Sequence, residues 1–194
     1  MAYELVVIGA SAGGLEAVAR VLSALPEGFA LPIAVAQHRA PAPPDGDLPA
    51  VWQRETALRV CEAEDKTTIA PGTVYVAPAD YHLLVETRGR FALSTDAPVL
   101  WARPSIDVLF QTAAEAYGEG VIGVILTGAS HDGSEGLSAI RRRGGCALVQ
   151  KPSTAECAVM PSAALAATEV NHVLELGDVG RVLAALAPPS AAAR

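Results

Sequence analysis

The chain has 194 residues, a length that fits one domain with a sizeable core. Hydrophobic residues make up 51% of it and charged residues only 18%, and this balance excludes intrinsic disorder. With 14 basic and 21 acidic residues the net charge is -7, and no basic run is present, which argues against nucleic acid or an anionic membrane as the main partner.

Neither a membrane segment nor a metal-binding pattern stands out in the sequence. No stretch of about 18 apolar residues runs unbroken. The N-terminus from Met1 to Glu4 has no basic region and no cleavage signal, so we expect a cytoplasmic protein without membrane insertion. The three cysteines, Cys61, Cys146 and Cys157, are widely spaced and form no C-x-x-C, so we expect neither a disulfide framework nor a metal site.

Short apolar runs alternate with helical patterns along the chain. The first run ends at Gly9, and beyond Gly14 apolar residues recur at helical spacing. Two runs around a turn at residues 87–89 predict an antiparallel hairpin of 82–86 and 90–94. We expect further strands at 5–8, 33–36, 59–63, 74–77, 121–126, 147–149 and 172–176, helices at 15–25, 50–55, 104–117, 134–143, 161–167 and 179–186, and a proline-rich loop at 41–49.

This alternation predicts an α/β fold. We expect a doubly wound, mainly parallel sheet with helices on both faces and the antiparallel hairpin as an addition. One domain would cover residues 1–187, followed by a disordered tail at 188–194. Ligands bind outside the carboxyl ends of the strands in such sheets, so polar residues that follow strands are the candidates for chemistry.

The first candidate is Ser11, which lies between a strand and a helix in the sequence Gly9-Ala10-Ser11-Ala12-Gly13-Gly14. G-x-S-x-G is typical of a nucleophile on a sharp turn at a helix N-terminus, where backbone N–H groups favour developing negative charge. Two alternatives stay open, a phosphate-binding loop and a plain turn with Ser11 as the N-cap. The G-x-G-x-x-G spacing and the Walker lysine are both missing, which weakens the case for nucleotide binding.

Two further candidates also follow strands. His38 comes directly after the second strand and could act as base for the serine. Asp132 follows the strand at 121–126 and could hold the imidazolium, although with Glu135 it also resembles a capping box. The neighbouring His131 is a rival base, and the glycines around it would leave backbone N–H groups free for an oxyanion.

Serine, histidine and aspartate in this order are found in a known family. The chain resembles the catalytic domain of bacterial chemotaxis protein-glutamate methylesterases, the CheB type, over residues of about 5–186. The matching motifs are Val7 to Gly14, Gln37-His38, Glu62 to Asp65, Pro71 to Pro78, Arg103 to Phe110, and Gly123 to Gly128 continuing to Asp132-Gly133.

The resemblance implies hydrolysis of a glutamate γ-methyl ester in a chemoreceptor-type protein, releasing methanol, and it also allows glutamine deamidation. It maps the triad onto Ser11, His38 and Asp132. An oxyanion hole would use the backbone N–H groups of Ala12 and Ala129. No cofactor is implied. Two-domain members carry an N-terminal receiver domain, which we expect this chain to lack because its serine motif begins at residue 9.

Three stretches depart from the family pattern. Ala12 replaces the usual threonine, residues 128–132 read Gly-Ala-Ser-His-Asp where Gly-Met-Gly-x-Asp is typical, and the loop after His38 differs. These departures support an alternative, a non-catalytic signalling domain that keeps the methylesterase fold.

Overall fold

A seven-stranded parallel sheet forms the centre of the protein. The computed structural model describes residues 2–39 and 47–188. The strands lie in the order β3-β4-β2-β1-β7-β8-β9, and β5 and β6 form a separate antiparallel pair. The bounds are β1 Leu5–Ala10, β2 Ile33–Gln37, β3 Arg59–Glu62, β4 Thr73–Val76, β5 His82–Thr87, β6 Arg90–Ser94, β7 Val121–Ile125, β8 Cys146–Gln150 and β9 His172–Leu174.

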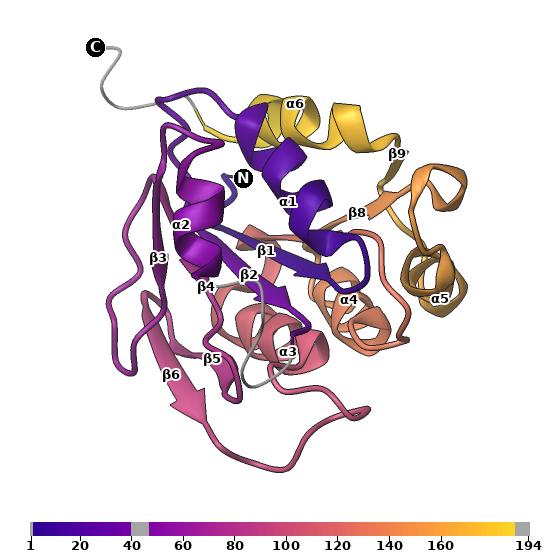
Figure 1. Ribbon diagram of the computed structural model, residues 1–194. Helices are drawn as coiled ribbons and strands as arrows, with labels where there is room; N and C mark the ends of the chain where they lie inside the picture. The colour runs from indigo at the N-terminus through magenta and orange to yellow at the C-terminus, as the bar shows by residue number, and fades with distance from the viewer. Residues whose placement is uncertain (1, 40–46, 189–194) are drawn as a thin grey trace.

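Helices cover both faces of this sheet (Figure 1). On one face lie α1 (Gly14–Ser23), α2 (Leu48–Gln53) and α6 (Leu176–Leu186). On the other lie α3 (Ile106–Tyr117), α4 (Ser134–Arg142), α5 (Val159–Ala167) and the β5–β6 hairpin. The five central strands, β4, β2, β1, β7 and β8, are apolar almost throughout because both of their faces are buried. The predicted fold class is therefore confirmed.

The starts of five helices differ from the prediction, that of α1 by a single residue, and proline explains three of the differences. Pro49 and Pro161 lie inside the first turns of α2 and α5, where a residue without an N–H sacrifices no hydrogen bond. The sequence instead suggested that these helices begin after or at the proline. Pro104 precedes α3, whose N-cap is Ser105. The α6 helix begins three residues earlier than predicted, at Leu176.

Parts of two predicted segments fall outside the described residues. These are residues 41–46 of the proline-rich loop and 189–194 of the tail. Among the helices in the described part of the chain, none has the length and apolar character needed to cross a membrane.

The chain order of the strands creates a switch point between β1 and β7. The connection after β1 leads to β2 on one side, and the connection after β7 leads to β8 on the other. All seven strands are parallel, so their carboxyl ends lie along one edge of the sheet. The segments after β1, β2 and β7 therefore meet there, at the place where doubly wound folds bind ligands.

The start of α3 lies close against β1 because two glycines leave room for it. A Cβ atom added at Gly9 would lie 2.3 Å from Cγ2 of Ile106, and one added at Gly133 would lie 2.7 Å from the same atom. The Ile106 side chain is fully buried, so it has little room to move away. These glycines let the first residues of α3 reach the edge of the sheet.

We predict that Gly9→Ala lowers the free energy of unfolding by about 1–3 kcal/mol, because the added methyl group overpacks a full core. Gly177→Ala on α6 is the matched control, since its added Cβ would come no closer than 3.7 Å to another atom. The control should lose no stability, because its added Cβ makes only ordinary van der Waals contact and alanine has the higher helix propensity. Urea denaturation of both variants tests this, and equal stabilities would contradict the close packing.

Candidate active site

Three turns that follow β1, β2 and β7 are joined by backbone hydrogen bonds. The N–H of His38 donates to the carbonyl of Ala10 at 2.9 Å, and the N–H of Ser11 donates to the carbonyl of Thr127 at 3.0 Å. Ser11 and His38 thus leave neighbouring strands side by side, next to the loop that leads to Asp132.

His38 and Asp132 form a direct pair. Nε2 of His38 lies 2.7 Å from Oδ2 of Asp132. The carboxylate is fully buried, and the histidine side chain keeps 13% of its surface exposed. A buried carboxylate that holds a partly exposed imidazole is the arrangement that orients a general base.

The carboxylate of Asp132 lies on the N-terminus of α3. It accepts hydrogen bonds from the Ser105 hydroxyl at 2.9 Å, the Ile106 N–H at 2.7 Å and the Asp107 N–H at 2.9 Å. The first N–H groups of a helix have no partner inside the helix, and the helix dipole favours negative charge there. Ser105 also caps α3, since its Oγ accepts from the N–H of Val108.

These contacts keep Asp132 ionised. Burial alone would raise the pKa of this carboxyl, but the hydrogen bonds from His38 and from the N–H groups of Asp107 and Ile106 outweigh it. The pKa of Asp132 therefore lies below its ordinary value of 3.8. An ionised carboxylate can only accept, so Nε2 of His38 carries the proton and Nδ1 is left as the basic nitrogen.

Two capping alternatives raised by the sequence are wrong. The N-cap of α4 is Gly133 with φ 101°, and no side chain caps that helix, so Asp132 does not form a capping box with Glu135. The N-cap of α1 is Gly13 with φ 74°, again without a side-chain bond, so Ser11 is not the cap. Neither the Ser11 side chain nor the Asp132 side chain is therefore used as a helix cap.

Ser11 is positioned by its backbone. The side-chain amide of Gln37 donates to the carbonyls of Ser11 at 2.9 Å and His38 at 3.0 Å, and this joins the two turns. The hydroxyl of Ser11 makes no hydrogen bond to the His38 ring in this structure, although the two residues follow neighbouring strands. Catalytic hydrogen bonds are often long in the absence of substrate.

The two alanines proposed for the oxyanion hole have backbone N–H groups without a partner among the described residues. The N–H of Gly128, the residue before Ala129, is not free, because it donates to the carbonyl of Cys157 at 3.1 Å. The Thr127 hydroxyl donates to the carbonyl of Ala12 at 2.8 Å and accepts from the N–H of Cys157 at 2.9 Å. Thr127 thus links the turn that holds Ala12 to the loop that holds Ala129.

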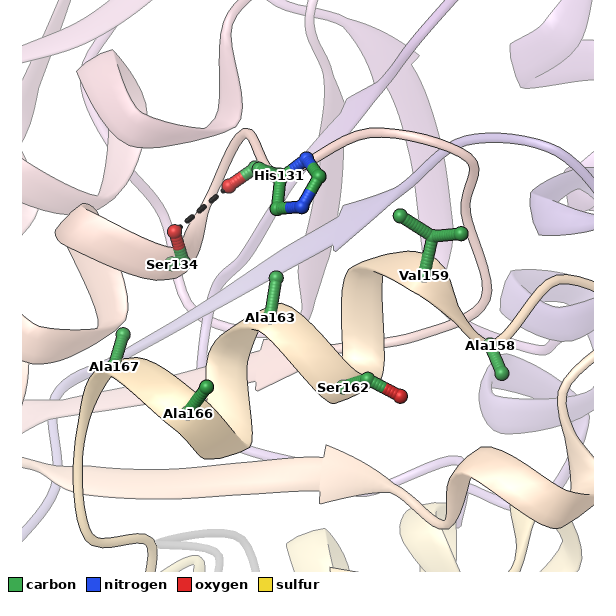
Figure 2. Close-up of a pocket in the computed structure, with 8 residues that line it drawn as sticks. All are labelled: His131, Ser134, Ala158, Val159, Ser162, Ala163, Ala166 and Ala167. Carbon is green, nitrogen blue, oxygen red and sulfur yellow. Dashed lines mark hydrogen bonds between the residues drawn. The ribbon is translucent and has the colours of Figure 1, made fainter.

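The rival base His131 lies away from this pair. It lines a separate open pocket of about 650 Å³ beside α5 (Figure 2). Its ring lies over Val159 and Ala163, and its carbonyl accepts from the Ser134 hydroxyl at 2.8 Å. The other members of the pocket lining are Ala158, Ser162, Ala166 and Ala167.

Several supporting residues were not predicted as part of the site. Gln37, Ser105 and Thr127 hold the turns, and buried His82 accepts the N–H of Ser105 at 3.1 Å. Gln37, Ser105 and Thr127 stand in stretches that match the family motifs, and Ser105 is also a residue type favoured at helix N-caps. The others act through contacts with residues distant in the chain, which no local pattern marks.

Asp107 is a second buried carboxyl next to Asp132. It accepts the N–H of Gly136 at 2.7 Å. Burial raises its pKa, as does the negative charge of Asp132, and the Gly136 hydrogen bond offsets only part of this effect, so the pKa reaches about 6.

Comparison with known proteins connects this geometry to one family. Residues 6–183 match the CheB methylesterase family. A putative protein-glutamate methylesterase/protein-glutamine glutaminase of Leptospira interrogans is 47% identical over 94% of both chains. Protein-glutamate methylesterase FrzG of Myxococcus xanthus is 44% identical over 93% of this chain and 54% of its own. The crystal structure of the Thermotoga maritima CheB methylesterase catalytic domain superposes with a TM-score of 0.89, at 32% identity, over 96% of this chain and 100% of that one.

We predict that Asp107→Asn gains stability relative to the unchanged protein as pH rises. The folded pKa of about 6 lies above the ordinary 3.8, so the folded state binds more protons between these values and Asp107 lowers stability as pH rises through them. The difference in unfolding free energy, variant minus unchanged protein, should grow by on the order of 1–3 kcal/mol from pH 4 to pH 7. Denaturant titrations at both pH values test this, and a constant difference would contradict it.

Proposed function

The chain belongs to the CheB methylesterase family and is a protein-glutamate methylesterase, a carboxylic ester hydrolase, and we propose that Ser11, His38 and Asp132 are its catalytic triad. The observation that carries the proposal is the 2.7 Å pair of His38 and buried Asp132 beside the Ser11 turn. The substrate is a methylated protein, and we propose that it is of the chemoreceptor type.

The reaction begins when Oγ of Ser11 attacks the carbonyl carbon of the glutamate methyl ester. Nδ1 of His38 takes the serine proton, and Asp132 stabilises the imidazolium through Nε2. The N–H groups of Ala12 and Ala129 hold the oxyanion of the tetrahedral intermediate. When the intermediate collapses, His38 returns the proton to the departing methoxide, and methanol leaves an acyl-enzyme.

Water then completes the reaction. His38 removes a proton from the water as it attacks the acyl carbon, and Ser11 leaves with that proton, which frees the glutamate side chain. Glutamine deamidation, the second activity in the name of the Leptospira relative, follows the same path with ammonia as the leaving group, and we propose it for this chain too. The cytoplasmic location and the absence of a cofactor stay predictions.

The alternative of a non-catalytic signalling domain rests on the altered residues near the site. Ala129 replaces a methionine of the family pattern, but an oxyanion donor is a backbone N–H, which the exchange of side chain keeps. Part of the altered loop after His38 falls outside the described residues. Labelling by a serine-directed phosphonate separates the two possibilities, because only an activated serine reacts.

We predict that Ser11→Ala lowers kcat for methyl-ester hydrolysis by on the order of 10⁴–10⁶, since the acyl-enzyme can no longer form. Methanol release from a methylated chemoreceptor measures the loss. The unfolding midpoint should stay close to that of the unchanged protein, which serves as the control for folding. Activity within tenfold of the unchanged protein would exclude the triad.

We predict that alanine substitutions at His38 and His131 have clearly different effects on kcat. His38→Ala should lose on the order of 10⁴-fold or more in kcat, because the base is gone. His131→Ala should retain activity within about threefold, because its ring lies over α5 and outside the proposed relay. The same methanol assay compares them, and the reverse order would show that the base is misassigned.

A further inference from the structure

A cavity of about 420 Å³ opens beside the proposed base. Its lining includes His38 and Ser130 from the active site and Leu100, Trp101 and Arg103 from the connection between β6 and α3. This connection runs out from the body of the molecule in Figure 1. The projecting loop therefore forms part of the wall of the cavity beside the proposed base.

Two large apolar side chains stand exposed on that loop. Trp101 is 100% exposed and Leu100 is 53% exposed. The only other tryptophan of the chain, Trp52, is fully buried. Apolar side chains that cluster at the mouth of a cleft mark a site of interaction.

The turn that presents them is well defined. Val99 and Ala102 exchange backbone hydrogen bonds of 3.1 and 2.9 Å, with Leu100 and Trp101 between them at φ 47° and 66°. A turn with two positive φ values is of type I′, which favours glycine and asparagine. Here it carries leucine and tryptophan instead, so the choice of side chain does not come from the backbone.

Arg103 fixes the base of the turn. Its guanidinium donates to Oδ1 of Asp80 at 3.0 Å and to the carbonyls of Thr95 at 2.8 Å and Asp96 at 3.0 Å. Arg39, the other cation of the cavity, is paired with Glu62 at 2.6 Å. Both arginines thus have acidic partners, and the exposed apolar side chains at this rim are Leu100 and Trp101.

We propose that the Leu100–Trp101 turn is a docking element for the methylated protein. The indole of Trp101 packs against apolar side chains that flank the modified glutamate, while the ester of that glutamate enters the cleft beside His38. This inference rests on the proposed function. The occupant is the protein substrate itself, because the turn and the catalytic histidine line one cavity.

Kinetics with two substrates test the role of the indole. Trp101→Ala should lower kcat/KM for the methylated protein by about tenfold, mainly through KM, as expected for an exposed aromatic anchor. The loss with p-nitrophenyl acetate should be at least fivefold smaller, since that ester is too small to reach the turn. Trp101→Phe should recover most of the loss. Equal losses with both substrates would overturn the proposal.

Two variants control for the fold of the turn and for lost surface. Trp101→Gly suits the positive φ and removes the indole, so it should lose as much as Trp101→Ala. If only the alanine variant loses activity, turn geometry matters and the docking role is excluded. Val173→Ala removes an apolar side chain that is 47% exposed on β9, and it should keep the same preference between the two substrates as the unchanged protein.

Fluorescence gives a readout that does not depend on turnover. In the Ser11→Ala protein, which holds substrate without cleaving it, saturating methylated protein should shift tryptophan emission to the blue and reduce quenching by acrylamide. A demethylated, tryptophan-free receptor fragment is the matched comparison, and it should reduce the quenching of tryptophan by acrylamide less. Unchanged quenching at saturation would overturn the docking role. Failure of the proposed function would appear separately, as absence of methanol release by the unchanged protein.

Discussion

A buried negative charge at the start of α3 determines how the site is built. An ionised carboxylate is costly to bury unless donors surround it, and Asp132 has four, from His38, Ser105, Ile106 and Asp107. Three of these donors belong to one helix end and the fourth to the proposed base. The orientation of the imidazole therefore depends on the docking of α3 against the sheet, which the glycines beside Ile106 make possible.

The direction of the His38 ring is a consequence of this arrangement. In the serine protease template, the carboxylate bonds Nδ1 and the serine faces Nε2. Here Asp132 bonds Nε2, so in the proposed mechanism the same relay runs through the ring in the opposite direction. Proton transfer needs only one nitrogen to be held and the other to be free, so both arrangements serve the same chemistry.

Much of the fold could be predicted from the sequence because its signals are local. Apolar runs and helical periodicity identified the strands and helices, and the rule for parallel sheets indicated the edge where Ser11, His38 and Asp132 would gather. The prediction that Asp132 forms a capping box with Glu135 was wrong because the contacts of Asp132 are not local in the sequence. Its donors lie about 25 residues earlier in the chain, on a helix whose position no neighbouring residue reveals. The side chains that hold the turns were missed on the same ground.

The loop that carries Ala129 is held from further along the chain. Thr127 and Gly128 bond to the backbone of Cys157, and the N–H of Met160 donates to Gly128 at 2.9 Å. During synthesis Ser11, His38 and Asp132, the proposed triad, leave the ribosome before Cys157 and Met160 do. A nascent chain that contains all three but ends before Cys157 lacks the residues that hold this loop, so the proposed oxyanion site is complete only when the segment before α5 has folded back onto β7.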